Sequence, residues 1–100
     1  MYARVSSYEI PTEGIGAAIQ GFEETGLESW DGFHRAYLLV DRGSGKALTI
    51  TMWESEEAVR ASAERANQAR AQVMEGASGA TVDVKEYEIA SVTERSSTPA

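Results

Sequence analysis

The sequence predicts one α+β domain with a ferredoxin-like fold, in which a four-stranded antiparallel sheet carries two helices. Three observations support this. Four segments are rich in β-branched and aromatic residues, two others repeat apolar residues with helical spacing, and the order is strand, helix, strand, strand, helix, strand. A chain of 100 residues has room for one hydrophobic core. We expect the domain to span residues 1–90 and residues 91–100 to form a flexible tail.

The first strand is expected from Tyr2 to Ile10, because the segment is rich in β-branched and aromatic residues and Pro11 follows it. Side chains alternate between the two faces of a strand. One face therefore carries Ala3, Val5 and Ser7, and the other carries Tyr2, Arg4, Ser6, Tyr8 and Ile10.

A helix is expected next, with Thr12 as its capping residue and Gly26 just past its end. Its apolar stripe has the helical spacing i, i+3, i+4, i+7 and consists of Ile15, Ala18, Ile19 and Phe22. Three glycines lie inside it, Gly14, Gly16 and Gly21, and each weakens a helix by about 0.5–1 kcal/mol relative to alanine. They indicate neutral drift, close packing against the sheet, or a helix that yields to admit a ligand.

A hairpin is expected from Gly32 to Glu54, with a four-residue turn over residues 42–45. If Asp41 pairs with Lys46, Val40 lies opposite Ala47, Leu38 opposite Thr49 and Ala36 opposite Thr51. The same register places His34 opposite Trp53.

The second helix is expected to start at Ser55, with Glu56 and Glu57 at its positive end. It is rich in alanine, and small side chains allow it to lie close to a sheet. A fourth strand is expected from Ala80 to Ala90.

Composition excludes several classes of function. The chain has no cysteine, which rules out disulfides, thiolate catalysis and cysteine-bound metal. Nine basic and sixteen acidic residues give a net charge of −7, which disfavours nucleic acids and anionic membranes as partners. The single histidine, His34, cannot form a two-histidine metal site, so we expect no metal or cofactor. No secretory signal or membrane-length apolar run is present, so we expect a cytoplasmic protein.

Both faces of the predicted sheet carry large apolar side chains. On the second strand, Leu38 and Val40 point to one face, and Tyr37 and Leu39 point to the other. Two helices cover only one face of a four-stranded sheet, whereas a solvated face normally alternates apolar with polar residues. We therefore expect a homodimer that forms through the second sheet face.

Three segments resemble the antibiotic biosynthesis monooxygenase-like domain of the dimeric α/β-barrel superfamily: Gly32-Phe33, Ala36 to Asp41, and Thr49 to Ala58, which reads TITMWESEEA. The resemblance covers about residues 1–90. It implies a homodimer whose sheets meet in a barrel, with a ligand cavity between helices and sheet in each subunit. It does not define the reaction, because such domains include cofactor-independent quinone-forming oxygenases, haem-degrading enzymes, isomerases and members without known activity.

The haem-degrading members of that family carry an asparagine on the first strand, and a tryptophan and a histidine on the second helix. This chain has Ser6 and Ser7 on the first strand, and the segment from Ser55 to Glu75 contains neither Trp nor His. Haem degradation is therefore disfavoured.

Three residues are candidate catalytic groups. Trp53 could donate a hydrogen bond from a cavity wall, His34 could act as a general base, and Tyr37 could polarise a carbonyl or hold a phenolate. Phe22, Phe33 and Arg35 are candidate substrate-binding residues, and Arg35 or Arg4 could bind an enolate oxygen. Each also has a structural interpretation: packing for the aromatic residues, a half-exposed strand position near Gly32 for His34, and ion pairs with Glu9, Asp83 or Glu86 for the arginines.

The leading hypothesis is a cofactor-independent monooxygenase that deprotonates a small aromatic, polyketide-like molecule and lets the carbanion react with dioxygen. The alternatives are a non-catalytic dimeric module that binds a hydrophobic metabolite, and a small isomerase or cyclase that uses proton transfer. An apolar void beside Trp53 of roughly 300 Å³ or more, with converging polar groups, would favour ligand handling, and a closed core would favour the inert module.

Overall fold

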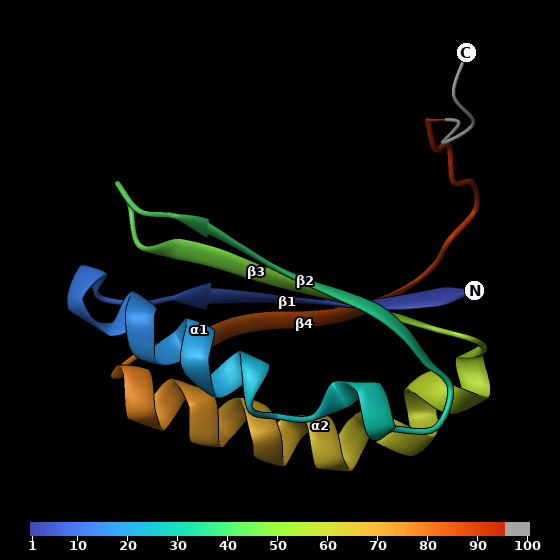
Figure 1. Cartoon of the computed structure of the whole chain (residues 1–100), viewed down its shortest axis with the longest axis horizontal. Coiled ribbons are helices and arrows are strands. Elements are labelled where there is room, and N and C mark those ends of the chain that lie inside the picture. Colours follow the sequence, from blue (N-terminus) through green and yellow to red (C-terminus); the bar gives the residue numbers. More distant parts are fainter. Residues whose placement is uncertain (96–100) are drawn as a thin grey trace.

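The computed structural model describes residues 1–95 and confirms the predicted fold class (Figure 1). Its four strands form one antiparallel sheet in the order β2-β3-β1-β4, and both helices lie on the same side of that sheet (Figure 1). The elements are β1 (Tyr2–Glu9), the 3₁₀ turn η1 (Thr12–Gly14), α1 (Ile15–Glu23), the 3₁₀ turn η2 (Leu27–Ser29), β2 (Phe33–Asp41), β3 (Lys46–Trp53), α2 (Glu56–Ala77) and β4 (Ala80–Glu88).

The β2–β3 hairpin has the predicted register along most of its length, with Asp41 opposite Lys46 and Leu38 opposite Thr49. The prediction that His34 lies opposite Trp53 is wrong. A β-bulge leaves Phe33 opposite Trp53, and the aromatic rings pack edge to face with their centroids 5.6 Å apart. The extra residue places His34 at an exposed position, because burying the phenylalanine against the indole removes more apolar surface from water.

The start of α1 also differs from the expectation. Thr12 makes no capping hydrogen bond, and the helix begins at Ile15 after the 3₁₀ turn. Gly14 lies so close to the end of α2 that a Cβ would be 2.0 Å from the carbonyl oxygen of Ala77. Gly21 approaches Val73 of α2 in a similar way. These glycines therefore serve close helix–helix packing, although the packing is against α2 rather than the sheet.

The start of α2 agrees with the prediction. The hydroxyl of Ser55 accepts a hydrogen bond from the backbone N–H of Ala58, and two glutamates lie in the first turn. β4 ends at Glu88, two residues earlier than expected. Residues 91–95 have no regular secondary structure and run away from the sheet on the side opposite the helices (Figure 1), while residues 96–100 of the predicted tail lie outside the described residues.

The hydrophobic core between helices and sheet has two parts. One gathers around Tyr8, Ile15 and Met74, where the ends of both helices meet the sheet. The other gathers around Trp30, Trp53 and Val59.

The opposite face of the sheet is open and carries large apolar side chains, as predicted, together with the Lys85–Asp83 ion pair of β4. Tyr37 and Leu39 of β2, Leu48 of β3 and Tyr87 of β4 are exposed, with Tyr87 at 50% and Leu39 at 47%. Leu39, Leu48 and Val82 line a shallow groove of about 560 Å³ on this side. We call this surface, with its half-buried neighbours Val5, Ile50 and Met52, the open face.

Within residues 1–95, no helix combines the length and hydrophobicity that crossing a membrane requires.

Candidate functional site

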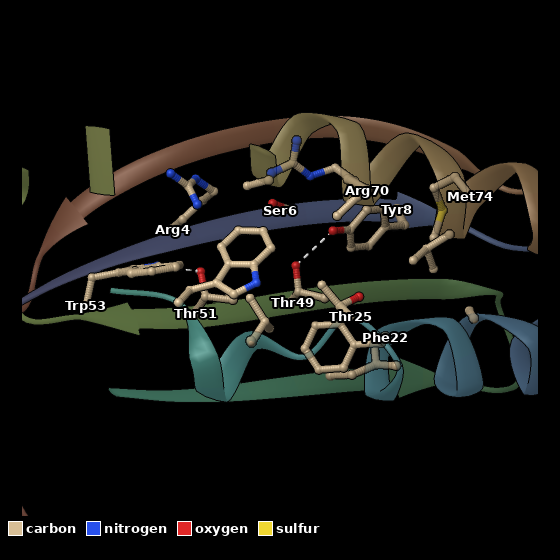
Figure 2. Close-up of a pocket in the computed structure, with 17 residues that line it drawn as sticks. Arg4, Ser6, Tyr8, Phe22, Thr25, Thr49, Thr51, Trp53, Arg70 and Met74 are labelled. Carbon is tan, nitrogen blue, oxygen red and sulfur yellow. Dashed lines mark hydrogen bonds between the residues drawn. The ribbon is translucent and has the colours of Figure 1, made fainter. Parts of the chain in front are cut away.

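A cavity of about 60 Å³ lies between the helices and the covered face of the sheet, where the two parts of the core meet (Figure 2). Its floor comes from β1, β2 and β3, and its walls come from both helices and the segment that joins α1 to β2. The lining is mostly apolar and includes Phe22, Leu27, Leu38, Val73 and Met74. The void lies beside Trp53, as a ligand-handling domain requires, but it is smaller than the roughly 300 Å³ typical of ligand pockets.

Hydroxyl groups of β1 and β3 form the polar part of the floor. The Tyr8 and Thr49 hydroxyls hydrogen bond to each other at 2.8 Å, and their side chains point toward one another in Figure 2. The Thr51 hydroxyl accepts a hydrogen bond from Trp53 Nε1 at 2.9 Å. Since two hydroxyls share one hydrogen bond, the Tyr8–Thr49 pair keeps one hydrogen to donate elsewhere.

Arg4 brings a positive charge into this interior. Its side chain is only 4% exposed, and its guanidinium donates to the Val59 carbonyl at 2.6 Å and the Ser62 hydroxyl at 3.3 Å. Burial lowers the pKa of Arg4, and the positive charge of Arg70 lowers it further, while Glu86 acts in the opposite direction. Glu86 lies 3.8 Å from the guanidinium, as one of the two sequence interpretations of Arg4 expected.

The charge of the cavity is opposite in sign to that of the whole protein. Arg4 and Arg70 are the charged residues among those that line it, and the lining contains no aspartate or glutamate. The chain as a whole carries a net charge of −7. Glu86, which lies outside the lining, offsets part of the charge of Arg4, and the charge that the lining itself contributes is positive.

Two indoles close one end of the cavity. Trp53 is fully buried, and its ring centroid lies 6.2 Å from that of Trp30. The guanidinium of Arg65 stacks over the Trp30 ring at 4.1 Å. Unlike Trp53, Trp30 has no hydrogen-bond partner for its buried Nε1 among the described residues.

The structure brings two of the six predicted site residues into the cavity lining, Trp53 and Phe22. Phe33 packs against Trp53 without lining the void. His34, Arg35 and Tyr37 are exposed on β2 and do not line it either.

The alternation along β2 explains this separation. Leu38 points to the helices, so Tyr37 points to the open face, where its hydroxyl accepts a hydrogen bond from Arg35 at 3.2 Å. Arg35 also pairs with Glu94 at 3.7 Å. His34, Arg35 and Tyr37 therefore do not lie with Trp53 in this cavity, and their candidate roles stay predictions.

Trp30 and Arg70 were not predicted from the sequence as site residues, and Tyr8, Thr49 and Thr51 were assigned no role. The alternation that puts Arg4, Ser6 and Tyr8 on one face of the first strand was a usable signal. Polar residues on the face that the helices cover must have polar partners or line a cavity.

The side chains around the cavity offer few ligands for a metal ion or a haem. Within residues 1–95 no group of three or more His, Cys, Asp or Glu side chains is arranged to hold a metal ion. The cavity lining contains no histidine, and the helix α2 contains none. The residues present therefore do not fit a haem held by a histidine ligand.

Comparison with known sequences identifies relatives without an assigned role. No protein-family model matches the chain. Two uncharacterized proteins of Mycobacterium tuberculosis, MT2634 of strain CDC 1551 and Rv2557 of strain H37Rv, are each 34% identical over 90 residues. These alignments cover 87% of this chain but only 40% of each relative, so the chain spans less than half the length of these curated relatives.

Solved structures establish the fold. A provisionally named antibiotic biosynthesis monooxygenase of Deinococcus radiodurans has a TM-score of 0.74 at 14% identity and covers 96% of this chain and 99% of its own. The haem-degrader MhuD of M. tuberculosis, with two haems in its active site, has a TM-score of 0.72 at 22% identity and covers 94% and 100%. SnoaB of Streptomyces nogalater, a cofactor-independent oxygenase, has a TM-score of 0.64 at 15% identity and covers 94% and 97%. The structural neighbours are thus antibiotic biosynthesis monooxygenase proteins, and the resemblance noted in the sequence is confirmed for the fold.

Proposed function

We propose that this chain is a cofactor-independent monooxygenase that acts on a small aromatic molecule with an enolisable oxygen. The observation that carries the proposal is the sign of the cavity charge: two arginines and no carboxylate line a mostly apolar space in an acidic protein. The likeness of the fold to SnoaB, a cofactor-independent oxygenase, supports the same reaction class.

The cavity residues have separate tasks in this proposal. Phe22 and Trp53 hold the flat apolar part of the substrate. Arg4 and Arg70 stabilise the oxygen of the enolate, which lowers the pKa of the substrate and reduces the need for a dedicated base. His34 has no task, because it does not line the cavity.

The reaction balances with dioxygen as the oxidant. An anthrone-type substrate loses both hydrogens of its ring methylene and gives four electrons to dioxygen. One oxygen atom becomes the new ring carbonyl, and the other leaves as water with those two hydrogens. No external reductant is needed.

The substrate must widen a cavity of about 60 Å³. We assign this movement to α1 and the segment that joins it to β2. The helix has nine residues, an internal glycine at Gly16 and no side-chain cap at its start. These features keep the helix soft relative to α2, which has 22 residues and the Ser55 cap.

Oxygen uptake by the metal-free protein with anthrone tests the proposal. We expect uptake above the uncatalysed rate, a loss of about tenfold or more in kcat/KM for Arg70→Gln, and no change for His34→Ala. Arg60→Gln is the matched control, since Arg60 is an exposed residue of the same helix that pairs with Glu56. Uptake that does not exceed the uncatalysed rate, or an equal loss in Arg60→Gln, would contradict the proposal.

We further propose that the protein is a homodimer in which the open faces of two copies meet. A contiguous apolar surface that includes Tyr37, Leu39, Leu48 and Tyr87 is unfavourable in water. Sedimentation at micromolar concentration is expected to give the mass of two chains. A stable monomer that does not aggregate would contradict this.

A non-catalytic binding module is the second candidate, because the cavity lining contains neither histidine nor carboxylate to act as a base. It predicts that aromatic ligands bind in the cavity without oxygen uptake above the uncatalysed rate.

A further inference from the structure

We propose that Trp30 is the ligand-orienting residue of the cavity, and that its indole N–H donates a hydrogen bond to a negatively charged oxygen on an aromatic ligand. The inference rests on the ligand-binding part of the proposed function and does not require the oxygenase step.

The indole N–H of Trp30 is a buried donor without a hydrogen-bond partner among the described residues. Trp30 is 6% exposed, and its Nε1 is buried without an acceptor among residues 1–95. A buried donor without a partner costs about 1–3 kcal/mol, and such groups are rare in folded proteins. The neighbouring Trp53 shows the usual arrangement, since its Nε1 donates to the Thr51 hydroxyl at 2.9 Å.

A ligand in the cavity can supply the acceptor that the Trp30 N–H lacks. Trp30 lines the cavity, so its indole borders the space that a bound ligand would enlarge and occupy. The guanidinium of Arg65 covers a face of the indole at 4.1 Å, and the Trp53 ring lies 6.2 Å away at 44°. These contacts fix the orientation of Trp30 while leaving its N–H without a partner.

The charged side chains that line the cavity with Trp30 are both positive. Arg4 and Arg70 line the same cavity, and no carboxylate does. Glu86, which lies outside the lining, offsets part of the charge of Arg4. The positive charge that remains at the lining favours a carboxylate, phenolate or enolate over a neutral carbonyl. The apolar lining around Phe22 and Leu27 favours an aromatic body for the rest of the ligand.

The test uses three probes of the same shape: 2-naphthoate, 2-acetylnaphthalene and 2-methylnaphthalene. They carry an anionic acceptor, a neutral acceptor and no acceptor. The chain contains two tryptophans, so a ¹⁵N–¹H spectrum shows two indole signals, and Trp30→Phe identifies one of them. Trp30→Phe keeps a flat ring and removes the N–H, and a thermal melt of the variant checks its fold.

We expect 2-naphthoate to move the Trp30 indole proton strongly downfield, 2-acetylnaphthalene to move it less, and 2-methylnaphthalene to leave it nearly unchanged. The Trp53 signal should move least, because its donor is already paired. By calorimetry, Trp30→Phe should weaken 2-naphthoate binding by about tenfold and 2-methylnaphthalene binding by less than about twofold.

Three outcomes would overturn the inference: no binding of 2-naphthoate at millimolar concentration, an unmoved Trp30 signal, or equal weakening of all three probes by Trp30→Phe. The last two would indicate that internal water or packing accounts for the buried N–H. Oxygen uptake is measured separately, so a failure of the oxygenase proposal does not decide this one. Likewise, normal uptake by Trp30→Phe with unchanged probe selectivity would reject only the role of Trp30.

Discussion

Both faces of the sheet carry apolar side chains, but helices cover only one of them (Figure 1). The face under the helices buries apolar side chains such as Trp53 and Ala47 together with polar ones, whereas the face without helices exposes tyrosine, leucine and valine side chains to water. A two-layer domain normally buries its apolar face and leaves its polar face in water.

Polar groups buried on the covered face and apolar groups exposed on the open face both depart from this pattern, which is consistent with the proposed ligand and the proposed dimer. Buried polar groups cost free energy unless they are hydrogen bonded, so the covered face is organised around polar contacts and a cavity. Exposed apolar groups also cost free energy, so the open face is organised for contact with another surface. The site and the proposed dimer are thus two consequences of one pattern of alternation along the strands.

The largest expected effect comes from placing a charge on the open face. Leu48→Asp would bury a carboxylate between two sheets in the proposed dimer, at a cost of several kcal/mol. We therefore expect the Kd of the dimer to rise by a hundredfold or more. Sedimentation equilibrium measures this. Ala71→Asp, on the exposed surface of α2, adds the same charge and should leave the mass unchanged. If both variants dissociated the dimer equally, the open face would not be the dimer interface.

The next effect concerns the buried arginine of the covered face. Arg4→Met keeps much of the side-chain volume but removes the donors to the Val59 carbonyl and the Ser62 hydroxyl. We expect the free energy of unfolding to fall by about 1–3 kcal/mol in urea titrations. Arg70→Met, whose partner Asn67 is exposed, should cost about 0.5 kcal/mol or less. If Arg4→Met were more stable than the wild type, the hydrogen bonds of Arg4 would not contribute to the stability of the fold, and only its proposed role in ligand binding would remain.

A smaller effect is expected for the Tyr8–Thr49 hydroxyl pair. Tyr8→Phe and Thr49→Val should each lower stability by about 1 kcal/mol, because each leaves a buried hydroxyl without its partner. The double variant should be more stable than the sum of the two losses predicts, because neither hydroxyl then remains. A double-mutant cycle measures this coupling, and additive losses would show that the pair contributes nothing beyond its separate groups.

The smallest effect lies in the β2–β3 turn, away from both faces. Hydrogen bonds from the Ser44 hydroxyl and the Gly43 backbone N–H lower the pKa of Asp41. A carboxylate with a lowered folded-state pKa adds stability above its unfolded pKa of about 3.9, and this stability is lost as the pH falls through the folded value. Asp41→Asn should therefore be slightly less stable than the wild type at pH 7. The difference should disappear in strong acid, as thermal melts across pH can show.

The sequence predicted features that depend on local interactions better than features that depend on contacts between distant segments. Ser55 and the glutamates after it mark the start of α2 by local hydrogen bonds and charge, and the prediction is confirmed there. The start of α1 was predicted less well, because contact with Ala77 of the distant α2 decides where Gly14 lies. The predicted position of His34 failed for a similar reason, since packing of Phe33 on Trp53 produced a bulge that no local signal encodes.

The sequence by itself determined the order of the elements, the two sheet faces and the overall charge, because periodicity and composition act along the chain. Only the tertiary structure decided which polar groups meet in the cavity. Trp30, Tyr8, Thr49 and Arg70 come from four separate segments, and their distances depend on how the helices pack on the sheet. The unpaired N–H of Trp30 has the same origin: whether a donor finds an acceptor depends on neighbours that the fold supplies.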